Sequence, residues 1–310
     1  MIVITVVATK GGVGKTTIAA NLGGLLRDLG LRVLMIDADV QPSLSRYFRL
    51  QHDAPNGLTA LVTSGFLSAD CMSTVQLPFG AYKDVAKYPL LPDIKLVRSD
   101  TREGNLQDWL APRLDRLVRL SMPLRHQNVQ EQFDVVIIDT QGALGYLQDA
   151  AINAADLLVS PATPDVISAR EFIDGSMKLI DRTEEAANLG LKVPPMKAVI
   201  NRLENTRDSR VMSELIREDF MRLKGRVTVM RTVIPSIVAF KKAATMQVPV
   251  HWIDPERAGQ VMHELLWELI PSLAGRYAPN HPNPGQQACG GTEPSPLAIQ
   301  SEASSTAPPQ

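Results

Sequence analysis

The feature that most constrains the fold is a glycine-rich loop that joins a β-branched run to a helical pattern. Ile2–Ala8 predicts a buried strand, and helical apolar spacing then runs from Thr16 to Leu29, where Gly30 ends it. Arg32–Asp37 predicts a second buried strand. A strand, a helix and a strand in immediate succession form a βαβ unit, and such a crossover implies that the two strands pair in parallel.

The same alternation returns after residue 130 and predicts an α/β fold with a doubly wound, mainly parallel sheet flanked by helices. Residues 51–130 are interrupted by prolines and contain one short strand candidate. The further strands are expected at Ile94–Val97, Phe133–Asp139, Leu157–Ser160, Lys197–Asn201 and Val227–Ile234, and the helices at Val166–Asn188, Asp208–Leu223 and Pro255–Leu269.

Length and composition set the domain organisation. With 310 residues, 45% of them hydrophobic, the chain has enough apolar surface for one α/β domain, which we expect over residues 1–275. Residues 276–310 are rich in Pro, Ser and Gly and contain few large apolar side chains. Such a segment buries too little surface to offset the entropy of ordering, so it predicts a disordered tail.

Charge, cysteines and hydropathy exclude several classes. A net charge of −1 predicts no general affinity for polyanions, so nucleic-acid binding would need a local basic patch. Cys71 and Cys289 are too few for a disulfide framework or a four-ligand metal site. No apolar run approaches the roughly 20 residues that span a bilayer, and no basic leader precedes Ile2. We therefore expect a cytoplasmic protein with no membrane partner.

The loop itself has the composition of a phosphate-binding site. Its glycines allow backbone N–H groups to turn toward a polyphosphate, and the following helix directs its positive end at the same anion. Lys15 is placed to reach the β and γ phosphates, and the Thr16 hydroxyl is placed to ligate Mg²⁺. The residues expected to hold the nucleotide here are Gly11, Gly12, Val13, Gly14, Lys15, Thr16 and Thr17.

Three acids stand at the ends of predicted strands. Asp37 and Asp39 follow the second strand, and Asp139 ends the strand that begins at Phe133. Doubly wound sheets bind ligands at the carboxyl ends of their strands, so these carboxylates are expected beside the phosphate loop. Asp37 fits a structural carboxylate that caps the loop as well as it fits a functional one.

Together these segments resemble the deviant Walker A family, whose members include the ParA/Soj partition proteins, MinD, the nitrogenase iron protein and ArsA. The resemblance rests on Lys10–Thr17, with Thr9 where the general loop has glycine, on Asp37-Ala-Asp39-Val-Gln41, and on Asp139-Thr-Gln-Gly-Ala. It implies ATP and Mg²⁺ as cofactors and an ATP-sandwich dimer. Lys10 would then reach the partner subunit's nucleotide, although by itself it is equally a solvated loop lysine.

The resemblance also implies roles for the carboxylates. Asp39 would position or activate the attacking water near the Mg²⁺ shell, and Asp139 would hold Mg²⁺ together with Thr16. The catalytic residues are thus expected to be Lys10, Lys15 and Asp39, and the metal residues Thr16, Asp39 and Asp139. Val40 stands where the family usually has proline. Gln141-Gly142 stands where most relatives have Pro-Pro after the threonine, which leaves open how the second switch is coupled to the nucleotide.

Two weaker similarities concern the base. Asn201 and Arg202 resemble the Asn-Arg pair that contacts adenine in relatives, and Pro235 lies in a segment similar to the one that borders the base. Asn201 fits a simple turn former equally well.

The resemblance fits the ParA/Soj branch better than the others, since the chain lacks cluster-ligating cysteines and a basic amphipathic helix at its end. It implies a homodimer in the ATP state, nonspecific DNA binding, a ParB-like stimulating partner and a nucleoid location. An alternative is an ATPase that positions a non-DNA protein cargo; a kinase or ligase ranks last. The DNA-binding candidates, each also open to a solvated-surface reading, are Arg222, Lys224, Arg226, Arg231, Lys241 and Lys242.

Overall fold

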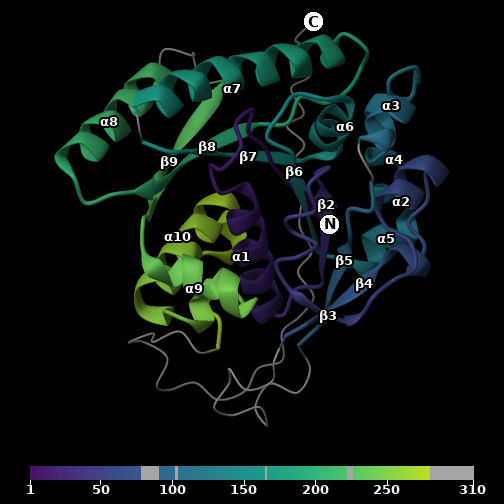
Figure 1. Cartoon of the computed structure of the whole chain (residues 1–310), viewed down its shortest axis with the longest axis horizontal. Helices are drawn as coiled ribbons and strands as arrows, with labels where there is room; N and C mark the ends of the chain where they lie inside the picture. Colours follow the sequence, from purple (N-terminus) through teal and green to yellow (C-terminus); the bar gives the residue numbers. More distant parts are fainter. Residues whose placement is uncertain (78–90, 102–103, 165, 222–225, 280–310) are drawn as a thin grey trace, which may run out of the picture.

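A nine-stranded sheet forms the centre of the computed structural model, with strand order β3-β4-β5-β2-β6-β1-β7-β8-β9 (Figure 1). The structure describes residues 1–77, 91–101, 104–164, 166–221 and 226–279. The seven strands β5-β2-β6-β1-β7-β8-β9 run parallel to one another. They are β1 (Ile2–Val6), β2 (Val33–Ala38), β5 (Ile94–Val97), β6 (Val135–Thr140), β7 (Leu157–Ala162), β8 (Met196–Leu203) and β9 (Val227–Pro235).

These strands confirm the predicted doubly wound, mainly parallel fold. Each coincides with a strand predicted from the sequence. β2, β6 and β7 are buried along their whole length, as expected for strands covered on both faces.

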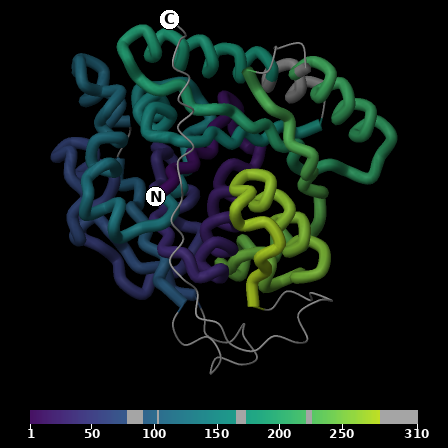
Figure 2. Tube along the Cα trace, turned by 180° about the vertical axis from the view of Figure 1, so that it is seen from behind, coloured from purple at the N-terminus to yellow at the C-terminus, as the bar shows by residue number. Residues whose placement is uncertain are grey.

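Helices cover both faces of the sheet (Figures 1 and 2). Alternate side chains of β1 divide between them: Ile4 and Val6 pack into the core under α1 and α10, whereas Val3 packs into the core on the opposite face. The first face carries α1 (Lys15–Asp28), α9 (Val238–Met246) and α10 (Gln260–Leu269). The second carries α2 (Leu58–Ser64), α3 (Asn105–Leu110), α4 (Ser121–Leu124), α5 (Gln127–Gln132), α6 (Tyr146–Ala154), α7 (Val166–Ala187) and α8 (Arg207–Met221).

Short helical turns complete the described elements. Four 3₁₀ turns lie at Ala69–Cys71, Arg116–Val118, Val250–Trp252 and Pro271–Leu273. The helix expected at Pro255–Leu269 begins with a π turn, Pro255–Gly259, before α10.

One edge of the sheet differs from expectation. β3 (Arg49–His52) and β4 (Ser73–Gln76) pair antiparallel with each other, and β4 pairs antiparallel with β5. Neither strand was predicted, because each is only 4 residues long and β3 is largely exposed, so neither shows a hydrophobic period. The region 51–130 therefore contributes helices and an edge to the sheet.

The carboxyl ends of the central strands determine where the site lies. β2, β6 and β1 are adjacent, and the register places Asp139 opposite both Asp37 and Val6. The loop that follows β1 and the acids that end β2 and β6 therefore meet at one edge of the sheet, as the topology of a doubly wound fold requires.

The carboxyl-terminal part packs on the first face. Arg276 donates to the carbonyl of Leu29 at 2.9 Å, and the amide of Ala278 donates to His263 at 2.9 Å, so the packed body extends at least to Ala278. Most of the predicted tail, residues 280–310, lies outside the described residues. Among the described helices, none has both the length and the apolar character needed to cross a membrane.

Candidate functional site

The phosphate loop adopts backbone angles that glycine allows. Gly12 has φ 76° and Gly14 has φ 94°, both in the left-handed region that disfavours other residues. Gly14 is the N-cap of α1, so the first amides of that helix face the loop. Two of the glycines that the sequence singled out are therefore required by the loop's shape.

The end of β8 holds this loop from outside. The Asn201 side-chain amide donates to the carbonyl of Val13 at 2.7 Å, and Arg202 donates to the carbonyl of Gly12 at 2.7 Å. Asn201 is only 4% exposed, and a Cβ at Gly14 would lie 2.3 Å from its Nδ2 atom. Asn201 thus supports the loop in this structure, a role beyond that of a simple turn former.

Lys15 is buried at the centre of the site. Its Nζ donates to the carbonyl of Lys10 at 3.3 Å, so its side chain follows the inside of the loop. Burial lowers its pKa, while the carboxylates of Asp139 and Asp39 act in the opposite direction. The ammonium therefore lies in a dehydrated setting, where an anionic phosphate would be bound strongly.

Thr16 and Asp139 form a hydrogen-bonded pair that leaves one oxygen of the buried carboxylate without a partner among the described residues. The Thr16 hydroxyl donates to Asp139 Oδ2 at 2.6 Å, while Asp139 Oδ1 is buried and has no hydrogen-bond partner among the described residues. Burial, together with the nearby Asp37, raises the pKa of Asp139 to about 8. A buried, unpartnered carboxylate oxygen beside a hydroxyl is a donor set that Mg²⁺ fits, so the residues present agree with the predicted metal.

The two acids after β2 have different surroundings. Asp37 is fully buried, and its Oδ2 accepts from the amide and the hydroxyl of Ser45 at 2.7 and 2.6 Å. Asp39 is only half-buried, and its Oδ1 accepts from the amide of Gln41 at 2.9 Å. The structural reading of Asp37, left open by the sequence, is the one that these contacts support. Asp39 lines the cavity above the loop.

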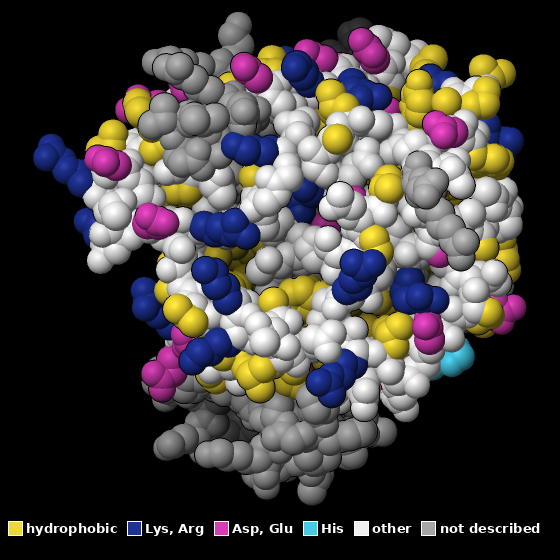
Figure 3. Space-filling model, in the orientation of Figure 1, with side chains coloured by type: hydrophobic (Ala, Val, Ile, Leu, Met, Phe, Trp, Pro, Cys, Tyr) yellow, Lys and Arg dark blue, Asp and Glu magenta, His cyan; other side chains and the backbone are white. Residues whose placement is uncertain are grey.

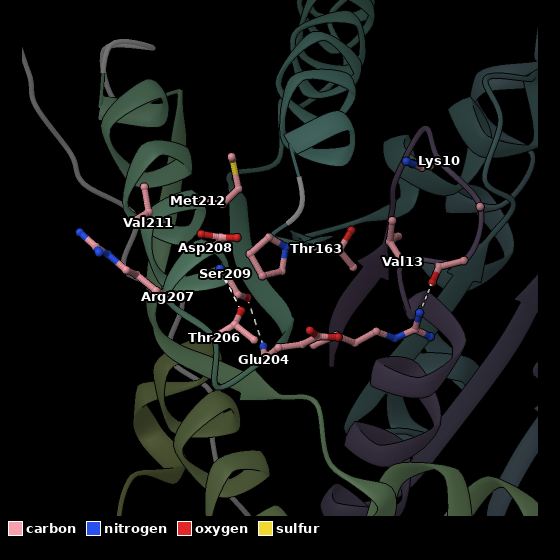
Figure 4. Close-up of a pocket in the computed structure, with 14 residues that line it drawn as sticks. Lys10, Val13, Thr163, Glu204, Thr206, Arg207, Asp208, Ser209, Val211 and Met212 are labelled. Carbon is pink, nitrogen blue, oxygen red and sulfur yellow. Dashed lines mark hydrogen bonds between the residues drawn. The ribbon is translucent and has the colours of Figure 1, made fainter.

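Two cavities border the phosphate loop. One, of about 560 Å³, is lined by Lys15, Thr16, Thr17 and Asp39 among others. The second, of about 870 Å³, lies between the loop and the start of α8 and includes Lys10 and Glu204 (Figure 4). Arg202, Gly11 and Gly12 line both, whereas Pro235, predicted near the base, lines neither.

Two glycines to which the sequence assigned no role, Gly142 and Gly175, allow other segments to pack closely against the phosphate loop. A Cβ at Gly175 of α7 would lie 1.8 Å from Thr9 Oγ1, so α7 packs directly on the residue that replaces the usual glycine. A Cβ at Gly142 would lie 2.7 Å from the amide nitrogen of Gly11. A glycine inside a helical pattern signals such close approach, but the partner segment is visible only in the fold.

The predicted basic stretch is less uniform than its sequence. Arg222 and Lys224 lie outside the described residues. Arg226 forms an ion pair with Glu184 of α7, with Nε 2.9 Å from Oε1. Arg231, Lys241 and Lys242 are exposed. In the space-filling view, which has the orientation of Figure 1, Lys and Arg side chains lie around the hollow in the middle of the visible face (Figure 3). Of the four predicted basic residues that the structure describes, all are exposed, and Arg226 is engaged in an ion pair.

Comparisons with known proteins agree with this geometry. The AAA domain family matches residues 1–193. Soj, the sporulation initiation inhibitor protein of Bacillus subtilis, is 26% identical over 260 residues, covering 83% of this chain and 93% of Soj. The chromosome partitioning protein ParA of Caulobacter vibrioides is 28% identical over 277 residues, or 89% and 96% of the two chains.

A further relative has a different cargo in its name. The maintenance of carboxysome distribution protein A of Synechococcus elongatus is 31% identical over 163 residues, covering 52% of this chain and 58% of that protein.

Solved structures share the fold. Apo McdA from Cyanothece superposes with a TM-score of 0.70 at 22% identity, covering 87% of this chain and 99% of that one. MinD from Pyrococcus horikoshii in complex with Mg-ADP gives a TM-score of 0.62 at 18% identity, covering 88% and 97%. Because the family match spans more than half of the chain and the relatives match over most of their length, this protein belongs to the AAA domain family and is a ParA/Soj-type P-loop ATPase.

Proposed function

We propose that the protein is a Mg²⁺-dependent ATPase that closes into an ATP-sandwich dimer, binds nonspecific DNA and moves DNA cargo with a ParB-like partner. The single observation that carries the ATPase assignment is the Thr16–Asp139 pair next to a glycine loop and Asp39, in which Asp139 is buried and one of its oxygens has no hydrogen-bond partner among the described residues. That MinD of the same fold is solved with Mg-ADP supports the choice of cofactors.

The chain's own residues have separable tasks in this proposal. The loop amides and Lys15 bind the phosphates, and Thr16 and Asp139 hold Mg²⁺, which neutralises charge on the phosphate oxygens when it is bound. Asp39 lines the same cavity from a more exposed position, where it positions the attacking water. Since catalysis of phosphoryl transfer is mostly positioning and charge neutralisation, loss of Asp39 lowers turnover more than affinity.

Dimer formation rests on Lys10 and the cavity beside it. Lys10 lines the cavity of about 870 Å³ that lies next to the loop, which is where a second copy would approach the nucleotide. A sample that stays monomeric with Mg²⁺ and a nonhydrolysable ATP analogue, measured by light scattering, would contradict the sandwich.

DNA binding rests on the exposed cations of β9 and α9. Arg231, Lys241 and Lys242 lie near one another in sequence and are exposed, and no acidic residue lies between 222 and 242. Lysine and arginine contacts to phosphates release counterions, so binding is independent of sequence and falls steeply with salt.

The test is retention of the analogue-bound protein on random-sequence DNA across a salt series. We expect binding in the presence of the analogue only, with a slope of log affinity against log salt of several units. Retention that is equal with ADP, or that does not depend on salt, would contradict the proposed ATP-dependent binding to nonspecific DNA.

A second candidate is an ATPase that positions a protein cargo. The similarity to the carboxysome distribution protein favours it, and so does the ion pair that engages Arg226 with Glu184. Both candidates use the same nucleotide chemistry. Stimulation of turnover by a purified partner bound to its DNA site supports partition, and stimulation by a partner without DNA supports the alternative.

A further inference from the structure

Gln148 is a fully buried amide that joins two segments of the nucleotide site. It lies in α6, and its Nε2 donates to the carbonyl of Ala8 and to the carbonyl of Gln141, both at 3.2 Å. Because both neighbours are carbonyl oxygens, the amide must present its nitrogen to them.

The two carbonyls belong to segments that must act together. Ala8 directly precedes the loop residues Thr9 and Lys10. Gln141 follows β6 and lines the cavity that contains Lys15 and Asp39. One buried side chain therefore connects the start of the phosphate loop with the segment that follows the Asp139 strand.

The segment that Gln148 contacts lies directly against the phosphate loop. After Thr140 it continues with Gln141-Gly142. A Cβ at Gly142 would lie 2.7 Å from Gly11 N and 2.9 Å from the carbonyl carbon of Lys10. Backbone atoms offer no room, so a proline at 142 is incompatible with the loop where it lies.

We propose that Gln148 is a positioning residue that holds the segment Gln141–Gly145 against the phosphate loop. The proposal rests on the ATPase function proposed above. Gln148 sets the position of the switch segment from behind and has no contact with substrate in this scheme.

The other end of the same amide suggests why the connection is switchable. Gln148 Oε1 is buried and has no hydrogen-bond partner among the described residues. An unpaired buried acceptor destabilises the arrangement that contains it, so a movement that supplies a donor competes with the present one.

The main test compares Gln148→Leu with Gln107→Leu. Gln107 of α3 accepts from the amide of Leu147, so it also bonds the start of α6 but has no bond to the loop in the structure. We expect Gln148→Leu to lower kcat about tenfold with ADP affinity changed less than about threefold, and Gln107→Leu to leave kcat within about twofold.

Hydrogen exchange gives a readout that does not depend on turnover. The amides of residues 141–145 should exchange faster in Gln148→Leu than in the parent. Because the Gln107 side chain lies beside Gly145, the comparison with Gln107→Leu uses the amides of residues 141–143, which should exchange at the parental rate at equal thermal stability.

A pH profile separates positioning from a packing role, even if Gln148→Leu is unstable. In Gln148→Glu, a protonated carboxyl still donates one hydrogen bond, whereas the ionised form is acceptor-only and faces two carbonyl oxygens. The kcat of Gln148→Glu relative to the parent should therefore fall as pH rises, while the ratio for Gln148→Leu should stay flat.

The proposal is overturned if both Gln148 variants keep parental kcat and parental exchange at 141–145, or if the Gln148→Glu ratio does not vary with pH. A parental protein that does not hydrolyse ATP would instead remove the ATPase assignment. The exchange experiment on metal-free protein would still decide whether Gln148 holds the segment.

Discussion

The edge of the sheet around the phosphate loop and the basic region of β9 and α9 are built in opposite ways. At the first, Lys15, Thr16 and Asp139 are held within one another's reach by adjacent strands and buried contacts. At the second, Lys241 and Lys242 are exposed. The difference teaches that chemistry on a phosphate needs a preorganised site, whereas binding a uniform polyanion needs only clustered charge.

The largest effect is expected from Lys15→Ala, which removes a buried cation from the preorganised edge. Loss of this charge-assisted contact should weaken binding of ATP and ADP by at least about a hundredfold. Isothermal titration calorimetry measures it, with Lys192→Ala as the control, since Lys192 is 57% exposed and pairs with Asp156. Affinity within threefold of the parent would show that Lys15 does not grip the phosphates.

Asp39→Ala should lower the rate of ATP hydrolysis and change the affinity for ATP only slightly. Removal of the residue that positions water should lower kcat about a hundredfold, with the dissociation constant for ATP changed only a few fold. The variant should accumulate as an ATP-bound dimer retained on DNA. Phosphate release and DNA retention are measured on the same sample, and hydrolysis at the parental rate would refute the catalytic assignment.

Substitutions in the basic region should have graded effects. The double change of Lys241→Ala and Lys242→Ala should weaken DNA binding about tenfold at moderate salt and lower the salt slope by up to about 2. Arg226→Ala is the matched comparison and should do less, because Arg226 is paired with Glu184. Titration of random-sequence DNA by fluorescence anisotropy measures both; equal effects would indicate that the ion pair opens on DNA.

The smallest effect concerns stability and pH. Burial raises the pKa of Asp139 to about 8 in the metal-free fold, above its unfolded value of roughly 3.9. The folded state therefore retains a proton that the unfolded state releases, and this residue's contribution to stability falls as pH rises between those values.

Asp139→Asn does not titrate, so without metal its Tm should exceed that of the parent by a few degrees at pH 8, and the difference should shrink toward pH 5. With Mg-ADP the order should reverse, because only the parent gains the metal contact. Thermal unfolding by circular dichroism gives both comparisons, and a Tm difference that is independent of pH would contradict the buried-carboxylate interpretation.

Much of the fold followed from local patterns. The seven parallel strands, β1, β2, β5, β6, β7, β8 and β9, each correspond to a strand predicted from the sequence. The short strands β3 and β4 were missed, as were the helices α2 to α6 and α9, the last of which carries Lys241 and Lys242. These elements are short or half-exposed, and their conformation depends on neighbouring elements more than on their own period.

The site divides in the same manner. Gly12, Gly14 and Asp139 could be singled out because a glycine loop and strand-end acids have local signatures. No such signature marks three other contacts: the bond from Asn201 to the loop, the packing of Thr9 on Gly175 and the two bonds of Gln148. The contacts of Asn201 with Val13, of Gly175 with Thr9 and of Gln148 with Ala8 each join segments that lie more than 100 residues apart in the chain.

The sequence by itself determined that a parallel sheet would carry a phosphate loop and acids at the carboxyl ends of its strands, because strand period, glycine conformation and crossover handedness are local or topological rules. Only the tertiary structure decided which acid is hydrogen-bonded to Ser45, which of the described basic residues are exposed and which carbonyls the Gln148 amide contacts. Those properties depend on burial and on hydrogen bonds between distant segments, and these exist only once the chain has packed.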